Sequence, residues 1–556
     1  MWKVKTALIV LLGLLAACGE KQAVSEKIAG NELKKNTLSH LTPYIPPQCY
    51  TNPVDEKNNA NNPCYICHTS SVRPNYFNDG ETQLSYSFPE PAYKNHWSNL
   101  FADRRVQVAA ISDADIKNYV NQDNYLQNGK IVLAEKLKNV PQQWDYDNNG
   151  QWSGYTPDSY FNFDQLGFDH NPDGSYTGWR AYAYAPLPGT FMPTNGSTDD
   201  VLIRLPASLQ QNNKGEFDQQ VYMVNLAVLE AMINEQDINI NEVDETIYGV
   251  DLNKNGKLDK STFVKYDWAP LKKRFMSYVG MGKTLFDKGE LKMAARLYPV
   301  GTEFIHSVRY LAVSEDNQVG MAKRMKELRY ARKTQWQNYN TLQTMVDAET
   351  KERHDFPSRT RTLFGNIEAG TTVPQGWIYQ GFIEDAAGDL RPQTFEENAF
   401  CVGCHSGLGA LTDTVFSMQR KFKSDSFQQG WYHWFQKSLA GTPEPKRADG
   451  EYEYSFYLKN NPSGNEFRTN DELRTKFFNA DGSQKAEAFA AAHEDLTHLI
   501  MPSAARALLL NKTYRSIVQE QSFIKGRDPI LQPLTTVHKE VELEADTGVK
   551  QELSLY

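Results

Sequence analysis

Long apolar runs, a basic surplus and internal repeats are all missing from this sequence. After Leu15 no stretch approaches the roughly eighteen consecutive apolar residues of a membrane-spanning helix, so we expect the body of the chain to be soluble. The formal net charge is −9, which argues against a nucleic-acid-binding surface. No repeat of fixed period appears. At 556 residues the chain is too long for one ordinary core, and we expect several structural units.

The first residues have the layout of an export signal. Lys3 and Lys5 precede the apolar stretch 7–15, which is too short to span a bilayer as a permanent helix. This stretch runs into Leu-Ala-Ala-Cys18, which resembles the bacterial lipobox, whose cysteine is acylated and becomes the mature N-terminus. A plain secretory signal is the alternative, because small residues before a cut suit both. Gly19 stands where an Asp would resemble an inner-membrane retention signal, so we expect an exported protein, in the periplasm or at the cell surface, that its lipid anchors to the outer membrane.

Cysteine is scarce, yet four of the six cysteines lie in two C-x-x-C-H motifs. The motifs are Cys64-Tyr-Ile-Cys67-His68 and Cys401-Val-Gly-Cys404-His405. This pattern is the attachment signature of haem c: two thiols reach the vinyl groups of the porphyrin, and the adjacent histidine becomes the proximal iron ligand. A redox dithiol and half of a zinc site are the alternatives, which are weaker because each run ends in His. The sequence therefore predicts two covalently bound haem c groups.

Both motifs resemble those of the c-type cytochrome superfamily. Two haems in an exported chain are also similar to the diheme cytochrome c peroxidase and MauG group, although the motifs here lie much farther apart. The resemblance covers the two motifs and a calcium-like region and implies cytochrome modules with haem among helices. The expected fold is therefore mainly α, with long irregular segments and a small β and calcium-loop region.

Composition shifts along the chain divide it into expected units. They are a signal peptide (1–17), a flexible tether (18–43), a first haem region (44–140), an Asp/Asn/Gly-rich calcium-loop region (141–270), a helical connecting region (271–395), a second haem domain (396–530) and a tail (531–556). Helices are expected from Asp113, capped by Ser112, and over 321–353, 486–499 and 504–519, with a short strand at 201–205.

The distal iron ligands decide what haems do. His306, in an apolar segment, is the leading candidate for the first haem, and Met501, beside a proline, for the second, although a lone histidine is more often structural. Cys49, the sixth cysteine, is either a thiolate ligand or a buried free thiol. Further candidates are His96, His170, Met192, Met418, His433, His493 and His498.

Three stretches alternate oxygen donors and end in glycine, as the first half of a calcium loop does. They begin at Asp145, Asp169 and Asp251. The third loop is the best candidate, with Asp251, Asn253, Asn255, the backbone of Lys257 and Asp259 as ligands. None has the glutamate at position twelve of an EF-hand, and three Asx-rich turns without metal are the alternative.

Three classes of function are open to such a chain. An electron-transfer protein would pass electrons through two haems between redox partner proteins that the sequence does not identify. A haem enzyme, a peroxidase or oxidase, would leave one iron open to substrate, and a calcium-stabilised binding protein would use its haems structurally. No catalytic constellation is recognisable, so electron transfer is the favoured prediction, with membrane contact through the lipid only and no nucleic acid.

Overall fold

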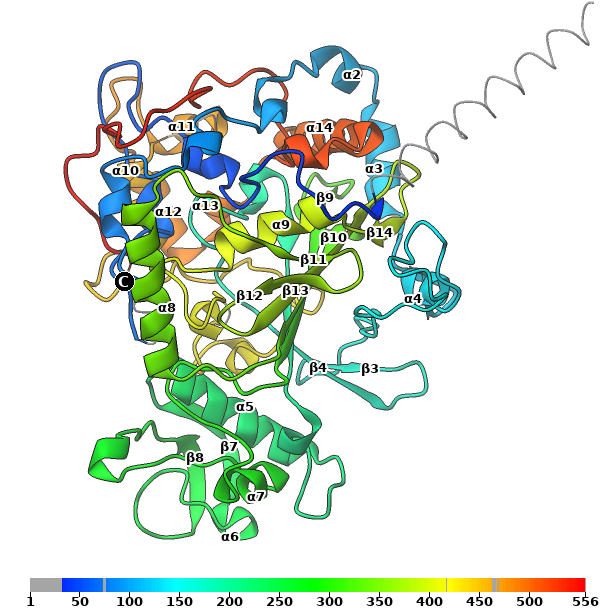
Figure 1. Cartoon of the computed structure of the whole chain (residues 1–556), viewed down its shortest axis with the longest axis vertical. Helices are drawn as coiled ribbons and strands as arrows, with labels where there is room; N and C mark the ends of the chain where they lie inside the picture. The colour runs from blue at the N-terminus through cyan, green and yellow to red at the C-terminus, as the bar shows by residue number, and fades with distance from the viewer. Residues whose placement is uncertain (1–32, 74–76, 417, 463–466, 468–469, 556) are drawn as a thin grey trace, which may run out of the picture.

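A ten-stranded antiparallel sheet forms the centre of the molecule in the computed structural model (Figure 1), which describes residues 33–73, 77–416, 418–462, 467 and 470–555. The main path of the sheet is β11-β12-β13-β10-β9-β6-β4-β3, with β14 beside β13 and β5 beside β9. The strands are β3 (Phe168–His170), β4 (Tyr176–Tyr182), β5 (Thr198–Asp199), β6 (Val201–Arg204), β9 (Glu303–Val313), β10 (Val319–Lys333), β11 (Phe364–Asn366), β12 (Gly370–Val373), β13 (Trp377–Glu384) and β14 (Leu390–Pro392).

Helices surround this sheet on several sides. They are α2 (Arg105–Ala109), α3 (Asp113–Asn121), α4 (Val132–Leu137), α5 (Gln219–Asn234), α6 (Glu245–Tyr248), α7 (Met281–Asp287), α8 (Tyr339–Asp355), α9 (Phe395–Cys404), α10 (Glu453–Asn460), α11 (Asp471–Phe477), α12 (Ala486–Glu494), α13 (Thr497–Ile500) and α14 (Ala504–Glu520). In Figure 1, α14 and α3 lie at the top, and α5 lies at the bottom with the two-stranded sheet of β7 (Ile238–Asp244) and β8 (Lys260–Val264). A second small hairpin pairs β1 (Leu126–Gln127) with β2 (Lys130–Ile131).

The expected mainly α fold of cytochrome modules is wrong, because the largest unit is this sheet. The stretch 321–353 contains the clearest error: its first part is strand β10, and only α8 is helical. Its residues are good helix formers, but β10 lies between β9 and β13, and pairing on both sides overrides helix propensity. Predictions with local signals are confirmed: Ser112 accepts from Asp115 N and caps α3, and α14 and β6 lie where expected.

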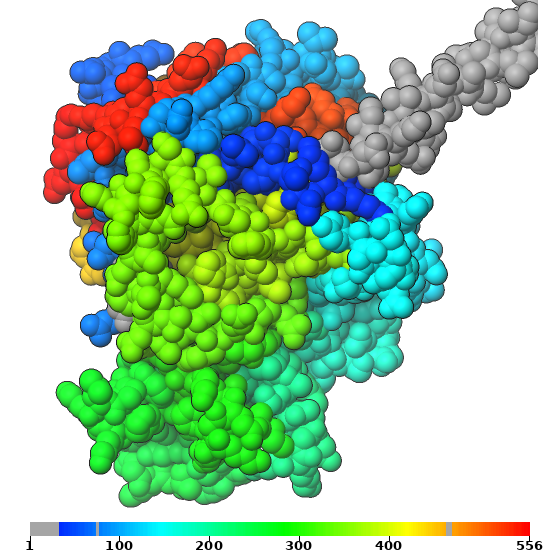
Figure 2. Space-filling model, in the orientation of Figure 1, coloured from blue at the N-terminus to red at the C-terminus, as the bar shows by residue number. Residues whose placement is uncertain are grey.

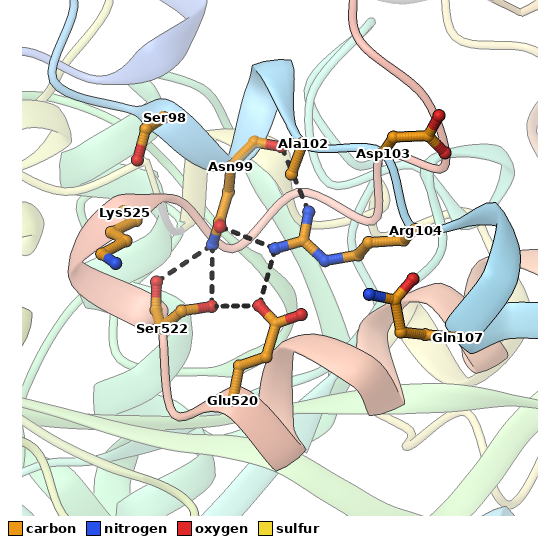
Figure 3. A pocket seen from close by; sticks show the side chains of 9 residues that line it. All are labelled: Ser98, Asn99, Ala102, Asp103, Arg104, Gln107, Glu520, Ser522 and Lys525. Carbon is orange, nitrogen blue, oxygen red and sulfur yellow. Dashed lines mark hydrogen bonds and ion pairs between the residues drawn. The ribbon is translucent and has the colours of Figure 1, made fainter.

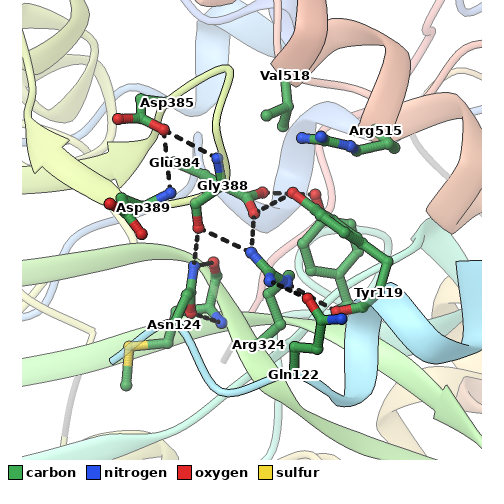
Figure 4. Close-up of polar contacts among 12 residues, drawn as sticks. Tyr119, Gln122, Asn124, Arg324, Glu384, Asp385, Gly388, Asp389, Arg515 and Val518 are labelled. Atoms are coloured by element: carbon green, nitrogen blue, oxygen red, sulfur yellow. Dashed lines mark hydrogen bonds and ion pairs between the residues drawn. The ribbon is translucent and has the colours of Figure 1, made fainter. Parts of the chain in front are cut away.

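One buried carboxylate of the sheet is the centre of a paired network. Glu384, at the end of β13, accepts hydrogen bonds from Arg324 of β10 and from the hydroxyls of Tyr119 and Tyr310 (Figure 4). The Arg324 guanidinium stacks over the Tyr119 ring at 3.9 Å. This network joins α3 to the sheet, and its pairing satisfies charges that would otherwise be costly to bury.

The segment 534–555, here called the C-terminal strap, runs back along the first haem region. It forms isolated bridges between Val537 and Thr51, between Glu540 and Lys94, and between Asp546 and Ser85. The expected tail (531–556) and the expected first haem region (44–140), which are at opposite ends of the sequence, are therefore in direct contact.

Cys18 and the signal peptide 1–17 lie outside the described residues. Within the described part of the chain, every helix is too short or too polar to cross a bilayer.

Candidate functional site: two C-x-x-C-H motifs in contact

The first motif begins on a short 3-10 helix, Cys64–Ile66, in a region of turns. His68 N hydrogen-bonds back to Cys64 O at 2.9 Å, which turns the histidine beneath the two cysteines. His68 Nδ1 lies 2.8 Å from Asp79 Oδ2. A bond at Nδ1 fixes the ring and leaves Nε2 available for a metal, as in metal-binding histidines generally.

The second motif occupies the C-terminal end of α9. Thr394 and Glu397 form a capping box at the start of this helix, and Arg391 pairs with the Glu397 carboxylate through two 2.8 Å bonds. Burial alone would raise the pKa of Glu397, but Arg391 outweighs it and holds that pKa below its usual value. The helix that carries Cys401 and Cys404 is therefore fixed at its N-terminal end.

A strained turn orients His405. Its Nδ1 lies 2.9 Å from Thr414 O, in a two-residue hairpin turn closed by mutual hydrogen bonds of Thr412 and Val415. Asp413 and Thr414 have φ of 49° and 63°, and a left-handed conformation is unfavourable for a β-branched threonine. The turn is held by a fully buried ion pair between Asp413 and Lys333, 2.6 Å long. Strain maintained in this way is typical of functional sites.

The fold brings the two motifs together although they are far apart in sequence. Ala410 N donates to Cys67 O at 3.1 Å, and Gly409 N donates to Asp79 Oδ1 at 3.0 Å. Burial raises the pKa of Cys67, and the neighbouring thiols of Cys404 and Cys49 raise it further. The five described cysteines are all free of disulfides. Four motif thiols thus lie around one shared region, with Cys49 beside them.

His306 lies near the second motif. It sits on β9 opposite Arg329 of β10, and its Nδ1 is buried without a hydrogen-bond partner, 3.9 Å from Asp199 Oδ2. Burial lowers its pKa to about 3, aided by Arg329, and His405 is close enough to contribute. The ring is therefore neutral, the form in which histidine binds metals.

The other proposed distal ligands are dispersed. Met501 packs in a separate apolar cluster with the buried Met192, away from the motif residues. His433 bonds Asp200 at 2.9 Å, and His170 bonds Asp164 on the β3–β4 hairpin. Of the two leading candidates, only His306 lies near a motif, and it is the second motif rather than the first, for which His306 was the candidate.

Sequence reasoning missed three residues of this site. Asp79 and Thr414 carry no motif, and only their contacts with His68 and His405 reveal them. His40 is buried with both ring nitrogens unpartnered, and it stacks on His96 with 4.9 Å between ring centroids. A histidine at the edge of the expected tether had no sequence signal.

The residues present fit haem c. Paired free thiols, a histidine with Nδ1 already bonded in each motif, and an unpartnered histidine near His405 are the donor set that haem attachment and ligation need. The surface in Figure 2 is hollowed beside α8, and yellow atoms of the chain near residue 400 lie at the bottom of the hollow.

The first and third calcium-like loops share one geometry. Asp145 accepts from the backbone N of Asn149 and Gly150, at 3.1 and 2.9 Å, and Asp251 accepts from Asn255 and Gly256 in the same way, at 3.2 and 2.9 Å. In each loop, positions four and six have positive φ: Asn148 59°, Gly150 78°, Lys254 59° and Gly256 87°.

Neither loop has a glutamate at position twelve, but a buried glutamate from another part of the chain contacts each loop. Glu368 accepts from Tyr146 N and Ser153 N, and Glu245 accepts from Leu252 N and Asp259 N. These are the same two loop positions in both cases. Carboxylate oxygens of Asp145, Asp147 and Glu368 lie within 4.8 Å of one another.

The second loop differs because Pro172 occupies position four. Proline fixes φ near −65°, so the left-handed residue of the other loops is excluded. The segment forms the turn between β3 and β4, and Asp169 accepts from Tyr160 N and Asn162 N instead.

A pocket of about 430 Å³ lies elsewhere, between the start of α2 and the end of α14 (Figure 3). Arg104 there bonds both Asn99 and Glu520, and Asn99 bonds Ser522. The polar groups of the pocket hydrogen-bond to one another, so they join α2 to α14 and have a structural role.

Comparison with known proteins identifies the family. A family model described as ":-like lipoprotein" matches residues 34–495, which include both motifs. The chain belongs to this lipoprotein family. The lipoprotein is 30% identical over 579 residues to an "Uncharacterized lipoprotein" of Aquifex aeolicus (strain VF5), which covers 94% of this chain and 91% of the relative. No solved structure matches it. It is an exported, lipid-anchored protein.

The expected membership of the c-type cytochrome superfamily, and the likeness to the diheme peroxidase group, are wrong. The matching family is a lipoprotein family, and the fold is built on a ten-stranded sheet. Two five-residue motifs carried that resemblance, and a short motif describes a site rather than a fold.

Proposed function

We propose that this lipoprotein binds two haem c groups covalently, through Cys64, Cys67, Cys401 and Cys404, and transfers electrons between redox partner proteins. The observation that carries the proposal is the contact of the first motif with the segment that directly follows the second, together with the fixing of His68 and His405 through Nδ1. When bound, each haem would supply a one-electron redox centre. The chain would supply the burial and the axial ligands.

Haem content tests this proposal directly. The full-length protein, produced in a host with haem c maturation, is expected to contain two covalent haems per chain by pyridine haemochrome assay and intact mass. Cys64→Ala/Cys67→Ala and Cys401→Ala/Cys404→Ala are each expected to lose one haem. Cys49→Ala is the matched control and should keep both. A chain with the unmodified mass would overturn the proposal.

Spin state separates electron transfer from the alternative haem enzyme. Two low-spin ferric signals in electron paramagnetic resonance are expected for an electron carrier. A stable high-spin signal that changes on addition of peroxide would contradict a pure carrier and favour a peroxidase or oxidase.

We further propose bound Ca²⁺ in the loops that begin at Asp145 and Asp251. Alternating oxygen donors, glycine at position six and a buried glutamate close to each loop support it. The lipid at Cys18 followed by Gly19 supports anchoring in the outer membrane, which fractionation of the membranes tests.

A further inference from the structure

Asp79 is a buried carboxylate that contacts the first motif and the segment that follows the second. It is 1% exposed. Its Oδ2 lies 2.8 Å from His68 Nδ1, and its Oδ1 accepts from Thr69 N and Gly409 N, each at 3.0 Å. Gly409 follows the second motif, so chain from both sites fixes this one side chain.

The two motif histidines have different partners. His68 faces a carboxylate, whereas His405 faces the neutral carbonyl of Thr414. A carboxylate draws the Nδ1 proton and increases electron donation from Nε2 to a bound iron. Its negative charge, buried nearby, also favours the ferric over the ferrous state.

We propose that Asp79 is a positioning residue that sets the reduction potential of the first haem below that of the second. This inference rests on the proposed haem content. Electrons would then pass from ferrous iron at the first motif to ferric iron at the second; one centre loses an electron, the other gains it, and no proton or further reactant is needed.

Glycine at 409 is required for this arrangement. A Cβ at Gly409 would lie 1.9 Å from Thr69 O and 2.5 Å from Asp79 Oδ1. The close approach of the two motif segments therefore gives Asp79 its third donor. Arg353, at the end of α8, is close enough for its charge to act against that of Asp79.

Variants of Asp79 test the inference through potentials and spectra. In a redox titration of the diheme protein, Asp79→Asn is expected to shift the lower of two waves to more positive potential and leave the upper wave in place. Asp79→Glu should restore most of the lower potential. Arg353→Gln should shift the same wave in the opposite direction. Asp55→Asn, at a half-buried turn residue of the same region that bonds Lys57 N and Asn59, should change neither.

The outcomes distinguish the two proposals. Absence of covalent haem from the wild-type protein overturns the proposed function. Two haems with both waves unmoved by Asp79→Asn, or equal shifts of both waves, overturn the role of Asp79. If Asp79→Asn does not fold, Arg353→Gln decides alone: a negative shift of the lower wave, with a change in one of two ferric resonance signals, supports the inference, and no shift overturns it.

Discussion

At the scale of single residues, His306 is the candidate distal ligand with the clearest chemistry. Its Nδ1 is buried and unpartnered and its ring is close enough for His405 to act on it, whereas Met501 packs in another cluster. From sequence, Met501 was the candidate ligand of the second haem and His306 a candidate ligand of the first. Their positions predict that substitution of His306, but not of Met501, changes the ligation of a haem.

Under the proposed haem content, His306→Ala is expected to open the second iron, because the buried and unpartnered His306 ring is close enough for His405 to act on it. The visible spectrum should gain a high-spin band, and one haem should bind cyanide at low concentration. Met501→Ala is the control and should leave both haems low-spin. A low-spin His306→Ala protein would contradict ligation by His306.

Lys333 and Asp413 form the most completely buried ion pair described here, with both side chains 0% exposed. Lys333→Met leaves a carboxylate uncompensated and is expected to lower the free energy of unfolding by about 3–5 kcal/mol in denaturant titrations. Because Asp413 precedes Thr414, the Soret band of the second haem should shift too. Lys351→Met, which removes an exposed helix pair with Asp355, should change the free energy of unfolding far less, because solvent screens that pair.

At the scale of elements, a cap supports the helix that carries the second motif. Thr394→Ala removes the side chain that accepts from Glu397 N, and about 1 kcal/mol of stability should be lost. Ser503→Ala, which uncaps α14, should cost a similar amount. Both variants should keep two haems, because thioether bonds do not depend on the cap; a loss of haem from either would contradict this.

The three calcium-like loops allow a controlled test, because the loop that begins at Asp169 differs from the other two and serves as the control. A chelator is expected to lower the melting temperature, and Asp145→Asn or Asp251→Asn should each reduce that effect. Asp173→Asn should not, because Pro172 prevents its loop from adopting the geometry of the others. Equal effects of all three substitutions would contradict the assignment.

Elements with local sequence signals could be predicted, whereas those that depend on tertiary contacts could not. The motif residues and the capped helix from Asp113 were predictable, because their signals are local. Strand β10 was not, since its Met, Lys, Arg and Glu residues favour a helix until two neighbouring strands pair with it. Asp79 and Glu368 could not be found either, because each acts on a segment that only the tertiary fold brings near.

At the scale of the whole molecule, two sites far apart in sequence form one centre. Two haems bound as proposed would lie close enough to couple their transition dipoles. We expect a bisignate couplet in Soret circular dichroism that disappears in either double-cysteine variant. A wild-type spectrum equal to the sum of the two single-haem spectra would contradict close placement of the haems.

The C-terminal strap closes over the first motif. Gln83 donates to His68 O at 2.6 Å and accepts from Leu553 N at 2.8 Å, and Leu555 N donates to Thr69 Oγ1 at 3.2 Å. A chain that crosses a membrane from its N-terminus exposes Cys64 and Cys67 long before residue 553 arrives. Under the proposed haem content, an enzyme that forms thioether bonds would therefore meet the first motif before residues 553–555 can cover it. Because the strap is the last part of the chain to be translocated, it would bury the first motif only after a cofactor could be attached there.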